Sequence, residues 1–378
     1  MKKKIIVLGS TGSIGESTLD VARNFPDLFE IVGLSAHARK TRLLIQQNEF
    51  NCSACCLSGL QAQDPDFPYY GEQGILQMLR NTEADIVVNG IAGAKGFLPS
   101  LVSLETKKDL ALANKETMVM AGPLVIETAV KNNCKILPVD SEHSALFFLI
   151  EKHGKPRISE LILTASGGAF RDTPKHELAN VTIADALSHP TWTMGKKITI
   201  DSATMANKGL EVIEAVELFD FTADNIKVTI HPQSMVHSLV RTTDGSLYAQ
   251  ISSPDMRVPI QNALSYPDQL PCKYGYMDII NNNLTFKPVE AGKFPMLETA
   301  FFCAKERKAY PVAYNAANEV AVKYFLQESI SFLAIPETVA AVLEPDWGYL
   351  LGSTEEILDA DTRARNYAEK YIKENLLS

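Results

Sequence analysis

Short apolar runs alternate with helical patterns along the first third of the chain. Each run is five to seven residues long and rich in aliphatic side chains, as is typical of strands buried in a parallel sheet. A run, a helix and another run form the repeating unit of α/β proteins, so the pattern predicts an α/β fold with a parallel sheet. The predicted strands are Lys4–Leu8, Glu30–Ser35, Asp85–Ile91, Asp109–Ala113 and Lys135–Val139.

A glycine-rich turn follows the first predicted strand. Gly9, Gly12 and Gly15 are spaced three apart and lead into a helix predicted over Glu16–Arg23. Glycines let the backbone approach a pyrophosphate, and a helix N-terminus offers unpaired N–H groups to it. In this strand-to-helix context the turn predicts a dinucleotide site. Its expected contacts are Thr11, Gly12, Ser13 and Ile14.

The second predicted strand is followed by basic residues rather than by an acid. An acid at this place usually holds the ribose hydroxyls of NADH, whereas positive charge suits the 2′-phosphate of NADPH. NADPH is therefore the favoured cofactor. The alternative is that these are solvated residues at a helix start. The expected contacts are Ala36, His37, Arg39 and Lys40, and Arg42 adds a further positive charge.

Polar triplets end two further strands of the predicted sheet. Asn114-Lys115-Glu116 follows one strand and Asp140-Ser141-Glu142 follows the next. Ligands of open parallel sheets gather at the carboxyl ends of strands, so both triplets are candidate site residues. The alternative for the first triplet is simple capping of a helix predicted over Thr117–Ala121.

Three carboxylates form a candidate metal set. Asp140 and Glu142 lie two apart, so an extended backbone would point both side chains the same way. Glu211 could supply a third oxygen ligand. Oxygen ligands favour Mg²⁺ or Mn²⁺, and no His or Cys spacing suggests structural zinc. The alternative for Asp140 and Glu142 is a helix cap or an ion pair.

The segment 189–215 carries the densest set of polar side chains. A β-type run over 198–200 precedes a helix predicted to begin near Ala206. On that helix Asn207, Lys208 and Glu211 share one face, because they are three or four residues apart. The opposite face is apolar, with Leu210, Ile213 and Val216. An amide, an ammonium and a carboxylate together predict an anionic, metal-assisted site.

A second candidate phosphate site follows the predicted strand over 161–165. Ser166-Gly167-Gly168 forms a turn of small residues whose amides and hydroxyl could cradle a phosphate. Together with Ser202, Asn207 and Lys208 it makes a candidate phosphate pocket, and an empty turn is the alternative. Two histidines lie further along the chain. His231 is predicted to have a structural role, because buried histidines often only satisfy hydrogen bonds. For His237 two alternatives stay open: its side chain lines the pocket, or it has no part in it.

A segment between His189-Pro190 and Gly195 carries Trp192 and Met194. A flexible stretch with an exposed aromatic side chain suits a lid that closes over a substrate and excludes water. The alternative is that Trp192 is a core residue, because tryptophan is largely buried in most proteins.

Bulk properties exclude several classes of protein. The 378 residues allow two or three domains, and the net charge of −9 argues against a nucleic-acid surface. No apolar run is long enough to span a bilayer, and the apolar N-terminus ends after Leu8 in glycines, so it is predicted to be a strand rather than a signal peptide. The six cysteines show no metal-type spacing, which favours reduced thiols and a cytoplasmic protein.

These motifs together resemble the 1-deoxy-D-xylulose 5-phosphate reductoisomerase family over nearly the whole chain. The 189–215 segment is the most specific part of the resemblance, and the glycine turn is the least specific. Two positions depart from the family pattern: Ala169 stands where proline is common, and His37-Ala38-Arg39-Lys40 replaces a glycine-lysine type. The remaining motifs are Gly9–Gly15, Asn114–Glu116, Asp140–His143, Ser166–Gly168 and His231–Ser234.

The resemblance implies three parts and a linker. A Rossmann-like domain over 1–139 binds NADPH, and an α/β domain over 140–265 carries catalysis and a homodimer interface. A linker over 266–292, rich in Pro, Asn and Tyr, leads to a helical bundle over 293–378.

The resemblance also implies the reaction and the roles of the residues. A five-carbon ketose phosphate is rearranged by a retro-aldol/aldol route or a 1,2-shift, and NADPH reduces the product to 2-C-methyl-D-erythritol 4-phosphate. Mg²⁺ or Mn²⁺, with Co²⁺ a further candidate, would bind Asp140, Glu142 and Glu211. Ser141 and His189 would contact the substrate, Lys115 would assist proton or charge handling, and Ser166, Ser202, Asn207 and Lys208 would hold the phosphate. Gly195, Met256 and the triplet Asn114, Lys115 and Glu116 would contact the cofactor.

Two other functions compete with this one. Another NADP-dependent two-domain dehydrogenase would need no metal set, and an inactive NADP-sensing regulator would keep the glycine turn alone. The acids and the phosphate-type residues favour the metal-assisted enzyme on a phosphorylated substrate.

Overall fold

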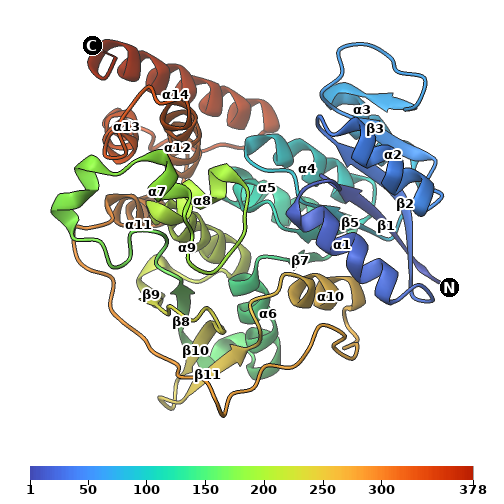
Figure 1. The fold of residues 1–378 in the computed structure, drawn as a ribbon, viewed down its shortest axis with the longest axis horizontal. Coiled ribbons are helices and arrows are strands. Elements are labelled where there is room, and N and C mark those ends of the chain that lie inside the picture. The colour runs from blue at the N-terminus through green and yellow to red at the C-terminus, as the bar shows by residue number, and fades with distance from the viewer. Residues whose placement is uncertain (378) are drawn as a thin grey trace. The chain divides into compact units, whose positions relative to one another are not determined.

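The computed structural model describes residues 1–377, which form two compact units (Figure 1). The first unit comprises Met1–Thr117, Pro123–Ser144 and Asp255–Tyr276. The second comprises Met118–Gly122, Ala145–Pro254 and the described residues from 277 to 377. In this division residues 255–276 belong to the first unit. The predicted domain boundaries, which fall after residues 139, 265 and 292, stay a prediction.

A seven-stranded parallel sheet forms the centre of the first unit; the alternating pattern predicts the parallel sheet and five of its strands, but not β3 and β4. The strand order is β4-β3-β2-β1-β5-β6-β7, so the order reverses direction between β1 and β5. The inner strands are buried on both faces because helices flank the sheet, which explains their continuous apolar runs. The strands are β1 (Lys3–Leu8), β2 (Phe29–Ala36), β3 (Ala54–Leu57), β4 (Tyr69–Tyr70), β5 (Ile86–Asn89), β6 (Asp109–Leu112) and β7 (Ile136–Pro138).

Helices connect these strands in the right order for a Rossmann-like domain. Helix α1 packs against α10, which comes from a distant part of the chain. The helices that begin in this unit are α1 (Ser13–Asn24), α2 (Lys40–Glu49), α3 (Gly71–Asn81), α4 (Phe97–Glu105), α5 (Lys115–Asn132), α6 (Ser141–His153) and α10 (Arg257–Ser265), with a 3₁₀ turn at Ala94–Gly96.

Helix α5 is longer than the predicted Thr117–Ala121. Its backbone leaves helical geometry at Ala121, where φ is −142° and ψ is 23°, and Pro123 follows. Proline has no N–H to donate and its ring clashes with the preceding turn, which explains the kink. The prediction ended the helix at this kink, whereas the chain resumes its helix after it.

The second unit contains a four-stranded mixed sheet and two groups of helices. The strand order is β11-β10-β8-β9, with β8 and β9 parallel and the other pairs antiparallel. The strands are β8 (Ile158–Ala165), β9 (Ile226–Ile230), β10 (Val236–Thr242) and β11 (Leu247–Ile251). A 3₁₀ turn at Lys155–Arg157 precedes β8. Between β8 and β9 lie α7 (Ile183–Leu187), α8 (Lys196–Ala203), α9 (Ala206–Phe219) and 3₁₀ turns at Lys175–Asn180 and Ala223–Asn225.

The predicted C-terminal helices are confirmed as four helices. In Figure 1 they run from orange to red, and α12 packs against both α13 and α14. The last helix begins with a capping box, in which Ser353 and Glu356 satisfy each other's backbone N–H groups. The four helices are α11 (Pro295–Glu306), α12 (Tyr310–Leu326), α13 (Ala334–Leu343) and α14 (Thr354–Asn375).

One sequence prediction in this unit is wrong. The β-type run over 198–200 lies inside helix α8 instead of a strand. The Thr199 hydroxyl donates to the Gly195 carbonyl at 2.9 Å, and Thr199 and Ile200 are buried. Packing of a buried helical face outweighs the preference of β-branched residues for strands, which spans only about 1 kcal/mol.

Two expectations about the whole chain concern membranes and cysteines. Within residues 1–377, no helix is both long and apolar enough to cross a membrane. All six cysteines are free thiols, as predicted.

Candidate active site

The glycine turn of the first unit has the geometry that a close backbone approach requires. A Cβ on Gly15 would lie 2.3 Å from the Cα of Ser10, so only glycine fits where α1 crosses the turn. Gly12 is the N-cap of α1 and has no side chain that could accept its first N–H groups. The turn therefore presents backbone donors at a helix N-terminus, next to the switch point between β1 and β5.

The basic residues after β2 have different partners. The Arg39 guanidinium lies against the glycine turn and donates from Nη1 to the carbonyl of Thr11 at 2.9 Å. Lys40 pairs instead with Asp64 at 2.6 Å and Asp66 at 2.9 Å, and these acids raise the pKa of Lys40. Arg39 is thus the cation that the fold keeps beside the predicted pyrophosphate turn, while Lys40 is neutralised.

The remaining residues of this candidate 2′-phosphate segment are arranged around the end of β2. Ala36 is the buried last residue of the strand. His37 follows it, with Nδ1 at 3.2 Å from the Ser58 hydroxyl, and Arg42 pairs with Glu16 on α1 at 2.6 Å. The alternative interpretation was that these basic residues have no role in binding a cofactor. It fits Lys40 and Arg42, which pair with acids, better than it fits Arg39, which lies on the glycine turn.

Asn114 caps helix α5, as the alternative interpretation predicted. Its Oδ1 accepts from the Thr117 N–H at 3.0 Å, and its Nδ2 donates to the carbonyls of Ile91 and Gly93. Nδ2 also lies 2.8 Å from an oxygen of Glu116. The side chain therefore ties the loop after β5 to the start of α5, and its predicted contact with a cofactor stays a prediction.

Asp140 and Glu142 do not lie on an extended backbone, so that part of the prediction is wrong. Asp140 precedes α6, and its Oδ1 lies 3.3 Å from the Glu142 N–H and 3.4 Å from Nδ1 of His143. Glu142 stands in the first turn of α6 and accepts from the Ser141 hydroxyl at 2.6 Å. Both acids lie at the N-terminus of α6, where the partial positive charge of the helix stabilises their carboxylates.

Asp140 also forms an ion pair. The Lys115 ammonium, from the start of α5, lies 2.6 Å from its Oδ2, and both side chains are nearly buried. The triplets that end β6 and β7 therefore meet, as expected for neighbouring strand ends. A cap and an ion pair were the alternative to a metal site, and the structure contains both.

In the second unit, the predicted shared face of α9 is confirmed. Nδ2 of Asn207 donates to Oε1 of Glu211 at 2.6 Å, and the Lys208 ammonium donates to its Oε2. The apolar side chains on the other face are buried, but so are Lys208 and Glu211, at 4% and 1% exposed. A charged pair is kept inside a protein only when its partners satisfy it, so this cluster is built at a cost and is not a surface feature.

The turn after β8 lies directly against helix α8. Gly168 has φ of +66°, and a Cβ there would lie 2.3 Å from the carbonyl oxygen of Ser202. Glycine is required at this position for both reasons. The two predicted phosphate-binding segments, Ser166–Gly168 and Ser202, are therefore neighbours.

His189 is joined to the same turn. Its Nε2 lies 2.9 Å from the Ser166 hydroxyl, while its Nδ1 accepts from the N–H groups of Thr191 and Trp192. This arrangement requires the neutral ring with the proton on Nε2, which donates to Ser166. Burial, and then the charge of Arg171, lower the pKa of His189, which agrees with a neutral ring.

Two basic residues that support the turn were not predicted as site residues. Arg171 donates from Nη1 to the Ser166 carbonyl at 3.0 Å, and the buried Lys293 donates to the Arg171 carbonyl at 2.9 Å. Arg171 follows the predicted turn Ser166–Gly168 by three residues, so its proximity in sequence is a usable signal. Lys293 is more than 120 residues away in sequence, and no local pattern points to it.

The other predicted residues are placed as follows. Trp192 and Met194 are half-buried in an irregular segment, so Trp192 is not a core residue, and its role as a lid stays a prediction. Gly195 precedes α8 in the second unit, and Met256 precedes α10 in the first. His231 has the predicted structural role, since Nδ1 binds the Thr285 carbonyl at 2.9 Å and Nε2 accepts from the Met235 N–H.

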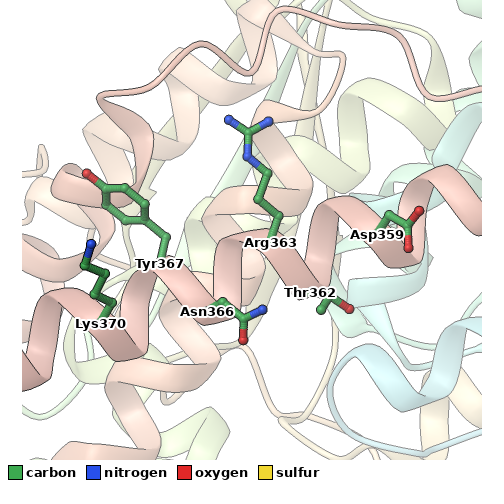
Figure 2. Close-up of a pocket in the computed structure, with 6 residues that line it drawn as sticks. All are labelled: Asp359, Thr362, Arg363, Asn366, Tyr367 and Lys370. Carbon is green, nitrogen blue, oxygen red and sulfur yellow. The ribbon is translucent and has the colours of Figure 1, made fainter.

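A pocket on the C-terminal helix contains none of the predicted residues. Figure 2 shows its side chains projecting from α14. Its one arginine, Arg363, lies over the rings of Trp347 and Tyr349, with centroid distances of 4.6 and 5.9 Å. Its cation therefore contributes to packing. The lining residues are Asp359, Thr362, Arg363, Asn366, Tyr367 and Lys370.

A Rossmann-like unit with this glycine turn defines a class, the proteins that bind a dinucleotide cofactor. Comparison with known families shows which family of that class the chain belongs to. A model described as 1-deoxy-D-xylulose 5-phosphate reductoisomerase matches residues 5–122, and models of C-terminal domains of that enzyme match residues 136–219 and 251–367. The chain belongs to the 1-deoxy-D-xylulose 5-phosphate reductoisomerase family.

Similar proteins and structures span nearly the whole chain. The reductoisomerase of Treponema pallidum (strain Nichols) is 46% identical, over 98% of this chain and 97% of its own. The one from Crocosphaera subtropica is 43% identical, over 96% and 95%. A solved reductoisomerase in complex with NADPH, fosmidomycin and magnesium has a TM-score of 0.90 at 37% identity, over 98% and 99% of the two chains. The NADPH complex from Zymomonas mobilis also has 0.90, at 34% identity over 99% and 100%.

Proposed function

We propose that this chain converts 1-deoxy-D-xylulose 5-phosphate to 2-C-methyl-D-erythritol 4-phosphate, using NADPH and a divalent metal ion. The observation that carries the proposal is the buried cluster of Asn207, Lys208 and Glu211, on a chain that its family matches almost from end to end. Buried charged clusters are concentrated at functional sites, where they act on a ligand. Relatives whose solved structures contain NADPH and magnesium support the choice of cofactors.

The phosphate of the substrate would bind to the second unit. The Ser166 hydroxyl accepts a hydrogen bond from Nε2–H of His189, so its own O–H is left to donate to a phosphate oxygen. Ser202 lies beside this turn, and Asn207 and Lys208 add an amide and an ammonium. Binding energy from the phosphate can then offset the ordering of the reacting end of the substrate.

The metal ion would bind to Asp140, Glu142 and Glu211. All three are carboxylates, the donor type that Mg²⁺ and Mn²⁺ prefer. The structure already balances the charge of two of them with an ammonium, Lys115 on Asp140 and Lys208 on Glu211. When bound, the cation would polarise the C–O groups of the substrate as a Lewis acid.

The other side chains would position the reactants. The Ser141 hydroxyl, which now donates to Glu142, would contact the substrate, and Lys115 would hold or deliver a proton beside Asp140. Arg39 would bind the 2′-phosphate of NADPH from its place on Thr11. His189 and Trp192 would close over the substrate and exclude water.

A spectrophotometric assay tests the proposal directly. NADPH absorbance is followed with 1-deoxy-D-xylulose 5-phosphate, first with Mg²⁺ or Mn²⁺ and then with a chelator. The expected result is oxidation that stops when the metal is removed and resumes when it is restored. Oxidation that the chelator does not affect contradicts the three-acid metal site. No oxidation by a folded chain that binds NADPH would support an inactive NADP sensor, and activity on an unphosphorylated substrate would support a different dehydrogenase.

We further propose that the protein is a cytoplasmic homodimer. Strand β11 is the edge of its sheet, and Leu247, Tyr248 and Ile251 on it are 49%, 40% and 37% exposed. An apolar sheet edge of this kind pairs readily with another chain. Sedimentation should give a dimer for the natural chain and a monomer after Ile251→Lys; a natural chain that sediments as a monomer contradicts the proposal.

A further inference from the structure

Helix α12, one of the four C-terminal helices, packs against α8 and α9, the two helices that carry predicted phosphate-binding residues. One contact to α8 is polar and buried. Asn318 of α12 donates from Nδ2 to Oδ1 of Asp201 at 2.9 Å, and the other oxygen of Asp201 lies 2.8 Å from the Lys197 ammonium. Asn318 is fully buried and Asp201 is 1% exposed.

The orientation of the Asn318 amide is fixed by Asp201. Its Oδ1 is buried without a hydrogen-bond partner, which is an unfavourable state for an amide oxygen. Turning the amide over would bring this oxygen against the Asp201 carboxylate and would lose the donor. The side chain thus gives up one hydrogen bond to keep another with α8.

Asp201 lies next to residues of both predicted phosphate-binding segments. Ser202 follows it directly, and the carbonyl of Ser202 lies against Gly168 of the other phosphate-binding segment. The Asp201 carbonyl also accepts from the Thr204 hydroxyl at 3.2 Å, in the corner that leads from α8 into α9. A displacement of Asp201 would therefore move Ser202, the turn at Ser166–Gly168 and the start of α9 together.

The same helix also limits the position of α9. A Cβ on Gly209 would lie 2.8 Å from the hydroxyl of Tyr314, which is completely buried on α12. That hydroxyl donates to the Met296 carbonyl of α11 at 3.1 Å, so it cannot move away freely. Gly209 directly follows Lys208, so α12 packs closely at the residue next to the predicted phosphate ligand.

We propose that Asn318 is a positioning residue for the phosphate subsite, which it holds in place by anchoring Asp201 on α8. This inference rests on the proposed function, because the subsite is the one assigned there to the substrate phosphate. It gives α12 a defined part in substrate binding: its buried amide sets the position of Ser202 without contacting the substrate.

Asn315 provides a matched control on the same helix. It too is fully buried and has an unpartnered Oδ1, but its Nδ2 donates to Glu319 of its own helix at 3.2 Å. Asn318→Ala and Asn315→Ala remove the same atoms from equally buried places. Asn318→Ala is expected to raise KM for the phosphorylated ketose about tenfold with kcat changed less than about threefold, while Kd for NADPH is unchanged. Asn315→Ala is expected to leave KM within about twofold.

A double-variant cycle tests whether the contact itself matters. If Asn318 acts through Asp201, the variant Asp201→Ala/Asn318→Ala should raise KM no more than Asp201→Ala alone, because loss of the Lys197 partner is common to both and cancels. Equal effects of Asn318→Ala and Asn315→Ala, or additive effects in the cycle, would overturn the proposal in favour of general stabilisation.

Hydrogen exchange provides a readout that does not depend on catalysis. In Asn318→Ala the amides of α8, Lys196–Ala203, should exchange faster than in the natural chain, and in Asn315→Ala they should not. Unchanged exchange in Asn318→Ala overturns the inference. A natural chain that fails to oxidise NADPH overturns the proposed function instead, and the exchange result still decides the role of Asn318.

Discussion

The candidate nucleotide site of the first unit and the candidate phosphate site of the second are built in opposite ways. In the first unit the backbone supplies the donors: a strand ends, three glycines follow within seven residues, and a helix begins at Ser13 with Gly12 as its N-cap. In the second unit side chains supply them, from the partly buried helix α8 and from helix α9, which is buried on nearly all sides. The first site is local in sequence, whereas the second is held by residues more than a hundred positions away, such as Lys293 and Asn318.

This difference shows where each site is vulnerable. A backbone site depends on a few positions where no Cβ is tolerated, and charged neighbours adjust its specificity. A buried side-chain site depends on mutual charge satisfaction, because each ion removed leaves its partner unpaired in a medium of low polarity. Substitutions in the first unit should therefore change cofactor binding, and substitutions in the second unit should change substrate binding or turnover.

The largest effect is expected at the charged cluster, from Glu211→Gln. Turnover should fall by at least about a thousandfold, because the variant removes a proposed metal ligand and leaves the Lys208 ammonium without its counter-charge. NADPH binding, measured by fluorescence, should persist because the first unit is unchanged. Glu217→Gln on the same helix is the control, since Glu217 pairs with Arg307 and burial raises its pKa. Loss of NADPH binding by folded Glu211→Gln contradicts the assignment.

The next effect tests backbone fit in the second unit. Gly168→Ala should raise KM for the phosphorylated substrate by more than about tenfold and cost about 2–4 kcal/mol of stability, because its Cβ meets the Ser202 carbonyl at 2.3 Å. Gly154→Ala is the control: its φ is +80°, but nothing lies within 4 Å of the added Cβ. It should cost only about 1–2 kcal/mol of backbone strain. Thermal unfolding and steady-state kinetics measure both, and equal KM values for the two variants would show that the turn does not bind the phosphate.

A smaller effect concerns cofactor preference in the first unit. Arg39→Ala should weaken NADPH binding about tenfold and NADH binding much less, because a guanidinium gains most from a 2′-phosphate. Lys40→Ala should change either affinity by less than about threefold, since Asp64 and Asp66 already neutralise that ammonium. Isothermal titration with both cofactors measures the difference. Equal weakening of NADPH and NADH by Arg39→Ala would remove its role in specificity.

The smallest effect is the pH dependence of substrate binding. Burial and Arg171 lower the pKa of His189 below its ordinary value of 6.5, so the folded state favours the neutral ring. Its contribution is complete above the unfolded pKa and is lost as pH falls through the folded one. KM should therefore be constant from pH 8 to about 6.5 and rise several-fold at lower pH. In His189→Gln, which keeps a donor for Ser166 but cannot titrate, this rise should disappear; a rise that persists would assign it to another group.

Local patterns predicted most of the fold. Five strands of the first unit (β1, β2, β5, β6 and β7) and the glycine turn were found, because strand and helix periods and glycine spacing act over a few residues. The short strands β3 and β4 were missed. The shared face of Asn207, Lys208 and Glu211 was found for the same reason. Where local preference and tertiary packing disagree, the prediction failed: Ile198–Ile200 is helical, and Asp140 with Glu142 opens a helix instead of ending a strand.

The amino-acid sequence by itself determined the class of fold, the place of the nucleotide turn and the residue types of the phosphate cluster, because each of these follows from spacing along one segment. Only the tertiary structure decided which charges are satisfied. It paired Lys40 with Asp64 and left Arg39 on the turn, and it buried Lys208 with Glu211. It also brought Asn318 to Asp201. Ion pairs and buried hydrogen bonds depend on distance in space and on the exclusion of water, and no pattern of neighbouring residues encodes either quantity.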